Sequence, residues 1–82
     1  MTRKYEAIWL RVRDADEGQW IEVRVASEAI IQTIINMVQL EKSRANVARK
    51  GLGLPQFGRL CIRREPEKKK VLFTLKNSGA HL

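Results

Sequence analysis

The segment from Glu28 to Lys50 carries apolar residues at helical spacing, and the rest of the chain must cover the buried face that this spacing creates. Ser27 is a suitable N-cap, and Gly51 is a suitable residue for ending a helix. We predict one helix over residues 28–50, about 34 Å long at ~1.5 Å per residue. Its buried face comprises Ile30, Ile31, Ile34, Ile35, Met37, Val38, Ala45 and Ala48.

One acidic residue interrupts this apolar stripe. Glu41 lies four positions after Met37 and seven after Ile34, where helical spacing predicts an apolar side chain. Either the helix bends or breaks near residues 40–43, or it extends past the sheet that covers it. We favour a helix that protrudes past the sheet.

Four further segments alternate apolar and polar residues with the period of two that indicates a strand: residues 5–13, 20–25, 57–64 and 71–76. A polar loop bent at Gly18 joins the first two segments, and a turn at residues 65–70 joins the last two. The order ββαββ predicts an α+β fold, in which a four-stranded antiparallel sheet carries one long helix on one face.

A chain of 82 residues buries one thin core, so we expect a single domain over residues 1–82, with residues 76–82 as a frayed tail. No stretch is apolar enough to span a bilayer and the N-terminus lacks a secretory signal, so we expect a cytoplasmic protein without membrane contact. The alternation assigns these residues to the core face of the sheet: Ile8, Leu10, Val12, Ile21, Val23, Val25, Leu60, Ile62, Val71, Phe73 and Leu75.

Positive charge is concentrated in the second half of the chain. The sequence has 16 Lys and Arg against 9 Asp and Glu, for a net charge of +7. Residues 1–41 carry a net −2, whereas residues 42–82 carry a net +9. Clustered cations sum their fields and attract a polyanion, although charged residues also serve simply to keep a protein soluble.

The opposite face of the predicted sheet combines aromatic and cationic side chains. Bases of a single strand stack on exposed rings while cations contact phosphates. Two alternatives stay open: the tryptophans pack across the strands under arginine stems, or the face docks a protein. The face would carry Tyr5, Trp9, Arg11, Arg13, Trp20, Glu22, Arg24, Arg59, Cys61, Arg63, Thr74 and Lys76.

Patterns for catalysis or metal binding are absent from the sequence. Gly51, Gly53 and Gly58 follow a helix, whereas phosphate-binding loops precede one, so these glycines indicate a flexible connector. One cysteine and one histidine, Cys61 and His81, exclude an internal disulfide and a zinc site built from those ligands. We expect no enzyme, no metal and no cofactor.

The sequence therefore predicts a small, basic, non-enzymatic protein that binds DNA or RNA mainly by electrostatic contact, with single strands slightly favoured. The alternative is a protein-binding module or small inhibitor that docks an acidic partner, or a second copy of the chain, through the Trp/Arg face. The cations at the helix end have a structural alternative too, since they offset the helix dipole. The predicted contact residues are Trp9, Arg11, Arg13, Trp20, Arg24, Lys42, Arg44, Arg49, Lys50, Arg59 and Arg63.

Overall fold

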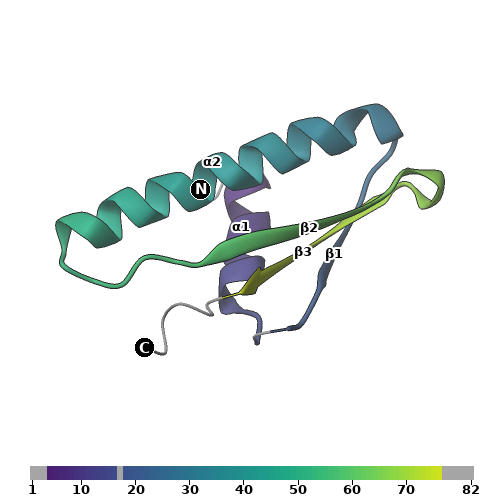
Figure 1. Cartoon of the computed structure of the whole chain (residues 1–82). Helices are drawn as coiled ribbons and strands as arrows, with labels where there is room; N and C mark the ends of the chain where they lie inside the picture. The colour runs from purple at the N-terminus through teal and green to yellow at the C-terminus, as the bar shows by residue number, and fades with distance from the viewer. Residues whose placement is uncertain (1–3, 17, 77–82) are drawn as a thin grey trace.

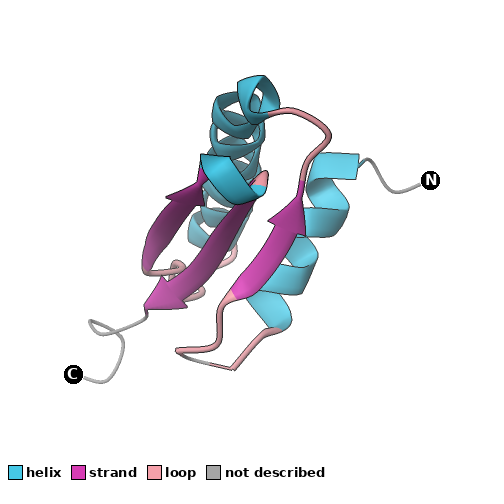
Figure 2. Ribbon diagram, turned by 90° about the vertical axis from the view of Figure 1, so that its right-hand side faces the viewer, coloured by secondary structure: helices cyan, strands magenta, loops and turns pink. Residues whose placement is uncertain are grey.

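The structure, a computed structural model, describes residues 4–16 and 18–76. Its strands form one antiparallel sheet in the order β1-β3-β2, and both helices pack against the same face of it (Figures 1 and 2). The α+β class is as predicted, but the sheet has three strands and a second helix is present. The elements are α1 (Lys4–Asp14), β1 (Ile21–Arg24), the 3-10 turn η1 (Glu28–Ile30), α2 (Ile31–Gly51), β2 (Arg59–Glu65), the 3-10 turn η2 (Pro66–Lys68) and β3 (Lys70–Lys76).

Residues 5–13 belong to helix α1 and do not form the predicted strand, so the first predicted hairpin is wrong. This segment contains both periods: Ile8, Leu10 and Val12 alternate as in a strand, whereas Ile8, Trp9 and Val12 recur at helical spacing. The helix is favoured because it buries Trp9, which a strand would place on the opposite face. Trp9 is 3% exposed and Val12 is 1% exposed, while Leu10 is only partly buried.

Charges at the two ends of α1 agree with the helix. Glu6 lies in its first turn and Arg11 and Arg13 in its last turn, so each charge stands near the dipole end of opposite sign. The Nε of Arg13 donates to Oδ1 of Asp14 at 2.9 Å, and this bond holds the pKa of Asp14 below its ordinary value. The same pattern is visible in the sequence and favours a helix over a strand.

The long helix is confirmed, because η1 and α2 together run from Glu28 to Gly51. Ser27 caps it as predicted, accepting a hydrogen bond from the backbone N–H of Ala29 at 3.2 Å. Helix α2 is unbroken, and its C-terminal end extends beyond the strands (Figure 1). Glu41 nevertheless does not face solvent; it is 9% exposed and lines a groove between α2 and α1.

The second predicted hairpin is confirmed as β2 and β3, with Leu60 opposite Leu75 and Ile62 opposite Phe73. Strand β1 pairs with the other edge of β3, with Val23 opposite Val71, and not with residues 5–13. The apolar side chains that the alternation assigned to the core face of these strands therefore do face the core: Ile21, Val23, Leu60, Ile62, Val71, Phe73 and Leu75. Lys76, expected to begin a frayed tail, is the last residue of β3, and residues 77–82 lie outside the described residues.

No helix within residues 4–16 and 18–76 has the length and apolar character needed to cross a membrane.

The burial of Trp9 predicts a large difference between the two tryptophans. Trp9→Ala should lower the free energy of unfolding by about 3–5 kcal/mol in urea titrations, because it leaves a cavity in the core. Trp20→Ala should cost less than about 1 kcal/mol, since Trp20 is 40% exposed.

In Trp20→Phe, the fluorescence of the remaining indole, that of Trp9, should resist quenching by acrylamide. Easy quenching of that variant would contradict the packing of α1.

Candidate functional site

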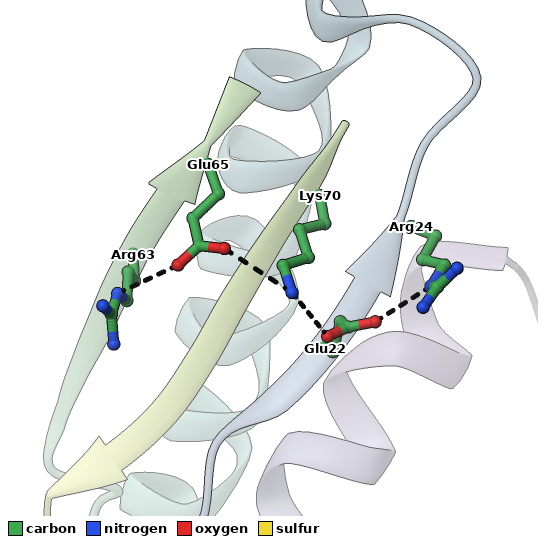
Figure 3. A network of polar contacts seen from close by, with 5 residues as sticks. All are labelled: Glu22, Arg24, Arg63, Glu65 and Lys70. Atoms are coloured by element: carbon green, nitrogen blue, oxygen red, sulfur yellow. Dashed lines mark hydrogen bonds and ion pairs between the residues drawn. The ribbon is translucent and has the colours of Figure 1, made fainter. Parts of the chain in front are cut away.

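A chain of ion pairs crosses the face of the sheet that the helices leave open (Figure 3). Arg63 Nε lies 3.2 Å from Glu65 Oε2, and Glu65 Oε1 lies 3.5 Å from Lys70 Nζ. Lys70 Nζ also lies 3.1 Å from Glu22 Oε1, and Glu22 Oε2 lies 3.0 Å from Arg24 Nε. Cations and carboxylates thus alternate from β2 through β3 to β1, and the three cations of the network share two carboxylates.

Two residues predicted to contact phosphates, Arg24 and Arg63, belong to this network. They lie on the open face as the alternation predicted, but each already has a carboxylate partner. Their side chains are 85% and 64% exposed, so water screens these pairs and each contributes little to stability. A phosphate on this face would have to compete with Glu22 and Glu65.

The two tryptophans do not share the open face. Trp9 lies in the core, where its ring meets Phe57 edge to face, with centroids 5.2 Å apart and planes at 86°. The guanidinium of Arg49 lies 4.1 Å from the centroid of the Phe57 ring and covers it. The prediction that Trp9 stacks on a base is therefore wrong, because its ring is buried. Trp20, just before β1, is 40% exposed.

The two arginines that were predicted to lie beside Trp9 on the open face are also on α1. Arg11 and Arg13 are exposed on α1, which lies beside β1 and away from the β2 edge of the sheet (Figure 2). Arg13 forms its ion pair with the neighbouring Asp14. The predicted track joining these arginines to Arg59 across one sheet face does not form, because residues 5–13 are helical.

The end of α2 is fixed to the loop of residues 52–58. Asn46 Oδ1 accepts a hydrogen bond from the Phe57 N–H at 2.6 Å, and Asn46 Nδ2 donates to the Phe57 carbonyl at 3.4 Å. Arg49 Nη1 donates to the Pro55 carbonyl at 3.0 Å. Arg49, predicted to contact phosphate, is therefore engaged in holding this loop against α2.

A groove of about 530 Å³ lies between α1 and α2. Glu41 Oε2 there lies 3.3 Å from Arg44 Nη1, with side chains 11% and 55% exposed respectively. Carboxylates and guanidinium groups are equal in number in the lining, so the groove has no net attraction for an anion. Arg44, a predicted contact, is thus paired. The lining residues are Glu6, Trp9, Leu10, Arg13, Glu41, Arg44 and Ala45.

Four cations near the free edge of the sheet form no ion pair with any acid of residues 4–16 and 18–76: Lys42 and Lys50 on α2, and Arg59 and Arg64 on β2. Lys42 and Lys50 lie one turn on either side of Asn46, on the side of α2 that contacts the loop leading into β2. Strand β2 pairs only with β3 and is an edge strand. We call these four residues the basic edge.

The acids around the basic edge are withdrawn from the surface. Residues 42–64 contain seven cations and no acid. The flanking acids, Glu41 and Glu65, have side chains that are only 11% and 17% exposed. This segment therefore presents a positive field to the solvent, except near Arg64, which lines a pocket together with the exposed Glu28. Arg64 is not among the predicted contact residues, although its place in this acid-free segment is visible in the sequence.

No group of three or more His, Cys, Asp or Glu side chains in the described residues is placed to hold a metal ion. Cys61 is a free, partly buried thiol on β2, opposite Thr74 of β3. His81 lies outside the described residues. The connector after α2, predicted from its glycines, has Gly53 at a φ of 73°, which a glycine adopts without strain.

Comparison with protein-family models, with curated proteins and with solved structures found no match to this chain.

The ion-pair network predicts an acid-dependent loss of stability. Hydrogen bonds from Arg24 and Lys70 hold the pKa of Glu22 below its ordinary value, which is about 4.3 in an unfolded chain. A lowered pKa in the folded state stabilises the fold above that pH, and the contribution is lost as the pH falls through the folded-state pKa. The stability difference between the wild type and Glu22→Gln should therefore be present at pH 7 and vanish in acid.

Denaturant titrations between pH 7 and about pH 2 measure this difference. Glu67→Gln removes the same charge outside the network and serves as the matched control, for which we expect no comparable loss. A Glu22→Gln difference that stays constant over this range would show that the network is not formed in solution.

Proposed function

We propose that the protein binds nucleic acid through the basic edge, mainly by electrostatic contact with phosphates. The observation that carries this proposal is the segment of residues 42–64, which has seven cations, no acid and nearly buried acids at both ends. Lys42, Lys50, Arg59 and Arg64 form no competing ion pair with a described acid, so a phosphate need not displace a carboxylate. Arg24 and Arg63 on the open face offer no such advantage because each is paired, whereas Arg59, on the same side of β2 as Arg63, is not.

The spacing of the basic edge suits a phosphate backbone. Lys42 and Lys50 are eight residues apart on α2, or about 12 Å at ~1.5 Å per residue. That distance matches the rise of three to four nucleotides at roughly 3.4 Å each. Contacts of this kind position a nucleic acid without reading its bases, so we propose weak dependence on sequence.

Base stacking has a smaller part in this proposal than the sequence predicted. The Trp9 ring is buried and the Phe57 ring is covered by Arg49. A preference for single strands therefore depends on Trp20, which precedes β1, at the sheet edge opposite β2. Stacking on one ring is worth roughly 1–3 kcal/mol per base.

A second candidate function is docking of an acidic protein, or of a second copy, on the open face. Exposed Trp20 favours it, since tryptophan is enriched at interfaces. The pairing of Arg24 and Arg63 with internal carboxylates leaves that face less attractive to an acidic partner. Sedimentation equilibrium separates the second copy from the other cases, and a monomer at high concentration contradicts a self-interface.

Titration of labelled single- and double-stranded oligonucleotides at several salt concentrations tests nucleic-acid binding. Affinity should fall steeply with salt, with a log–log slope of roughly −0.7 to −0.9 per phosphate contact. Lys42→Gln/Lys50→Gln removes two contacts and should make the slope shallower by about 1.4 to 1.8.

The matched control is Lys4→Gln/Arg11→Gln, which removes two exposed cations from α1, away from the β2 edge. We expect its slope to equal that of the wild type. If both double variants made the salt slope equally shallower, the phosphate contacts would not be concentrated at the basic edge. Absence of any binding at about 50 mM salt would overturn the proposed function itself.

A further inference from the structure

Exposed apolar side chains are concentrated from the middle of α2 to the loop that follows it. Five large apolar residues are exposed in residues 4–16 and 18–76, and four of them fall between positions 40 and 54. Single exposed apolar residues are normal on a soluble protein, whereas a concentration of them indicates an interaction surface. The four are Leu40 at 41% exposure, Val47 at 73%, Leu52 at 74% and Leu54 at 48%, and we call them the α2 patch.

Two members of the α2 patch lie on one side of the helix, away from the core. Leu40 and Val47 are seven residues apart, which returns them to the same side after two turns. The buried residue Val38, at 0% exposure, marks the opposite side of α2. The spacing of Leu40 and Val47 suits a second helix lying along α2.

The other two members are held in place by the backbone. The Leu52 N–H donates to the Arg49 carbonyl at 3.0 Å, and the Leu54 N–H donates to the same carbonyl at 2.9 Å. The Arg49 side chain then anchors the following residue by its bond to the Pro55 carbonyl. Leu52 and Leu54 are thus exposed by a fixed loop, and little conformational entropy remains to be lost when a partner covers them.

The charges beside the α2 patch indicate the partner. Arg44 and Lys50 flank Val47 on α2, and no acid occurs in residues 42–64. Two copies of this surface would bring like charges together, which opposes self-association. The patch has no aromatic residue, whereas helices that lie on lipid surfaces commonly carry Trp or Phe on the apolar side.

We propose that the α2 patch docks an acidic amphipathic helix of a partner protein. The apolar side of that helix covers Leu40, Val47 and the fixed leucines, and its carboxylates lie against Arg44 and Lys50. Recognition of a helix by its apolar side, with charges at the rim setting orientation, is a general mode of binding. This surface is separate from the basic edge except for Lys50.

The probe is a labelled, designed amphipathic helix with leucines along one side and glutamates beside them, followed by fluorescence anisotropy. Wild-type protein should bind it, and Val47→Ser/Leu52→Ser should weaken binding at least about tenfold, because each lost side chain removes apolar contact area. Ala7→Ser replaces an exposed apolar side chain of α1 outside the patch and should leave affinity unchanged. Circular dichroism confirms that the variants stay folded, since the altered residues are exposed.

Three outcomes overturn the proposal: no binding of the acidic peptide up to millimolar concentration, equal binding of a peptide with lysine in place of glutamate, or equal binding by Val47→Ser/Leu52→Ser. Binding of phosphatidylserine vesicles without binding of the peptide assigns the patch to lipid instead. A dimer in sedimentation that Val47→Ser/Leu52→Ser dissociates assigns it to a second copy. Oligonucleotide affinity should not change in that variant, so failure here is distinct from failure of nucleic-acid binding.

Discussion

The contact of Trp9 with Phe57, covered by Arg49, is the interaction on which the placement of the other surfaces depends. It joins three parts of the chain: α1, the last turns of α2 and the loop that leads into β2. The bonds of Asn46 to Phe57 hold the same loop from the other side. Because of these contacts the last turns of α2 are held against the loop that leads into β2, where Lys50, Leu52 and Leu54 lie.

Pairing, rather than exposure, distinguishes the cations of this protein. Arg24 and Arg63 are well exposed, yet their charges are compensated by Glu22 and Glu65 on the open face. The acids nearest to the basic edge in sequence are already paired with other cations, Glu41 with Arg44 and Glu65 with Arg63 and Lys70. Positive charge reaches the solvent here because the neighbouring carboxylates of Glu41 and Glu65 are largely covered. The net charge of the chain alone does not reveal this arrangement.

The sequence predicted those elements in which only one periodicity was present. The helix over residues 28–50 and the hairpin of β2 and β3 were correct because their apolar residues fit one spacing and their ends carry a cap, a glycine or a polar turn. Residues 5–13 fit two spacings; the charges at the two ends of the segment favour a helix, and the burial of Trp9 in the core agrees with it. The single error of predicting a strand there placed Arg11 and Arg13 in the predicted site, and it also hid the surroundings of Glu41, since Leu10 and Arg13, which line the same groove, lie on the unrecognised helix.

The composition of residues 42–64 indicates where positive charge is concentrated, whereas the position of a single arginine does not show whether its charge is free. Of its seven cations, Arg44 and Arg63 form ion pairs and Arg49 supports a loop, so a residue-by-residue assignment from sequence was right only in part. The absence of acids holds whatever each cation does, so the segment keeps its net positive charge. Lys42 and Lys50 project from the side of α2 that meets the loop, and Leu40 and Val47 from the side away from the core. One helix end therefore presents two chemically different surfaces, one cationic and one apolar, and its burial against Trp9 and Phe57 keeps both in place.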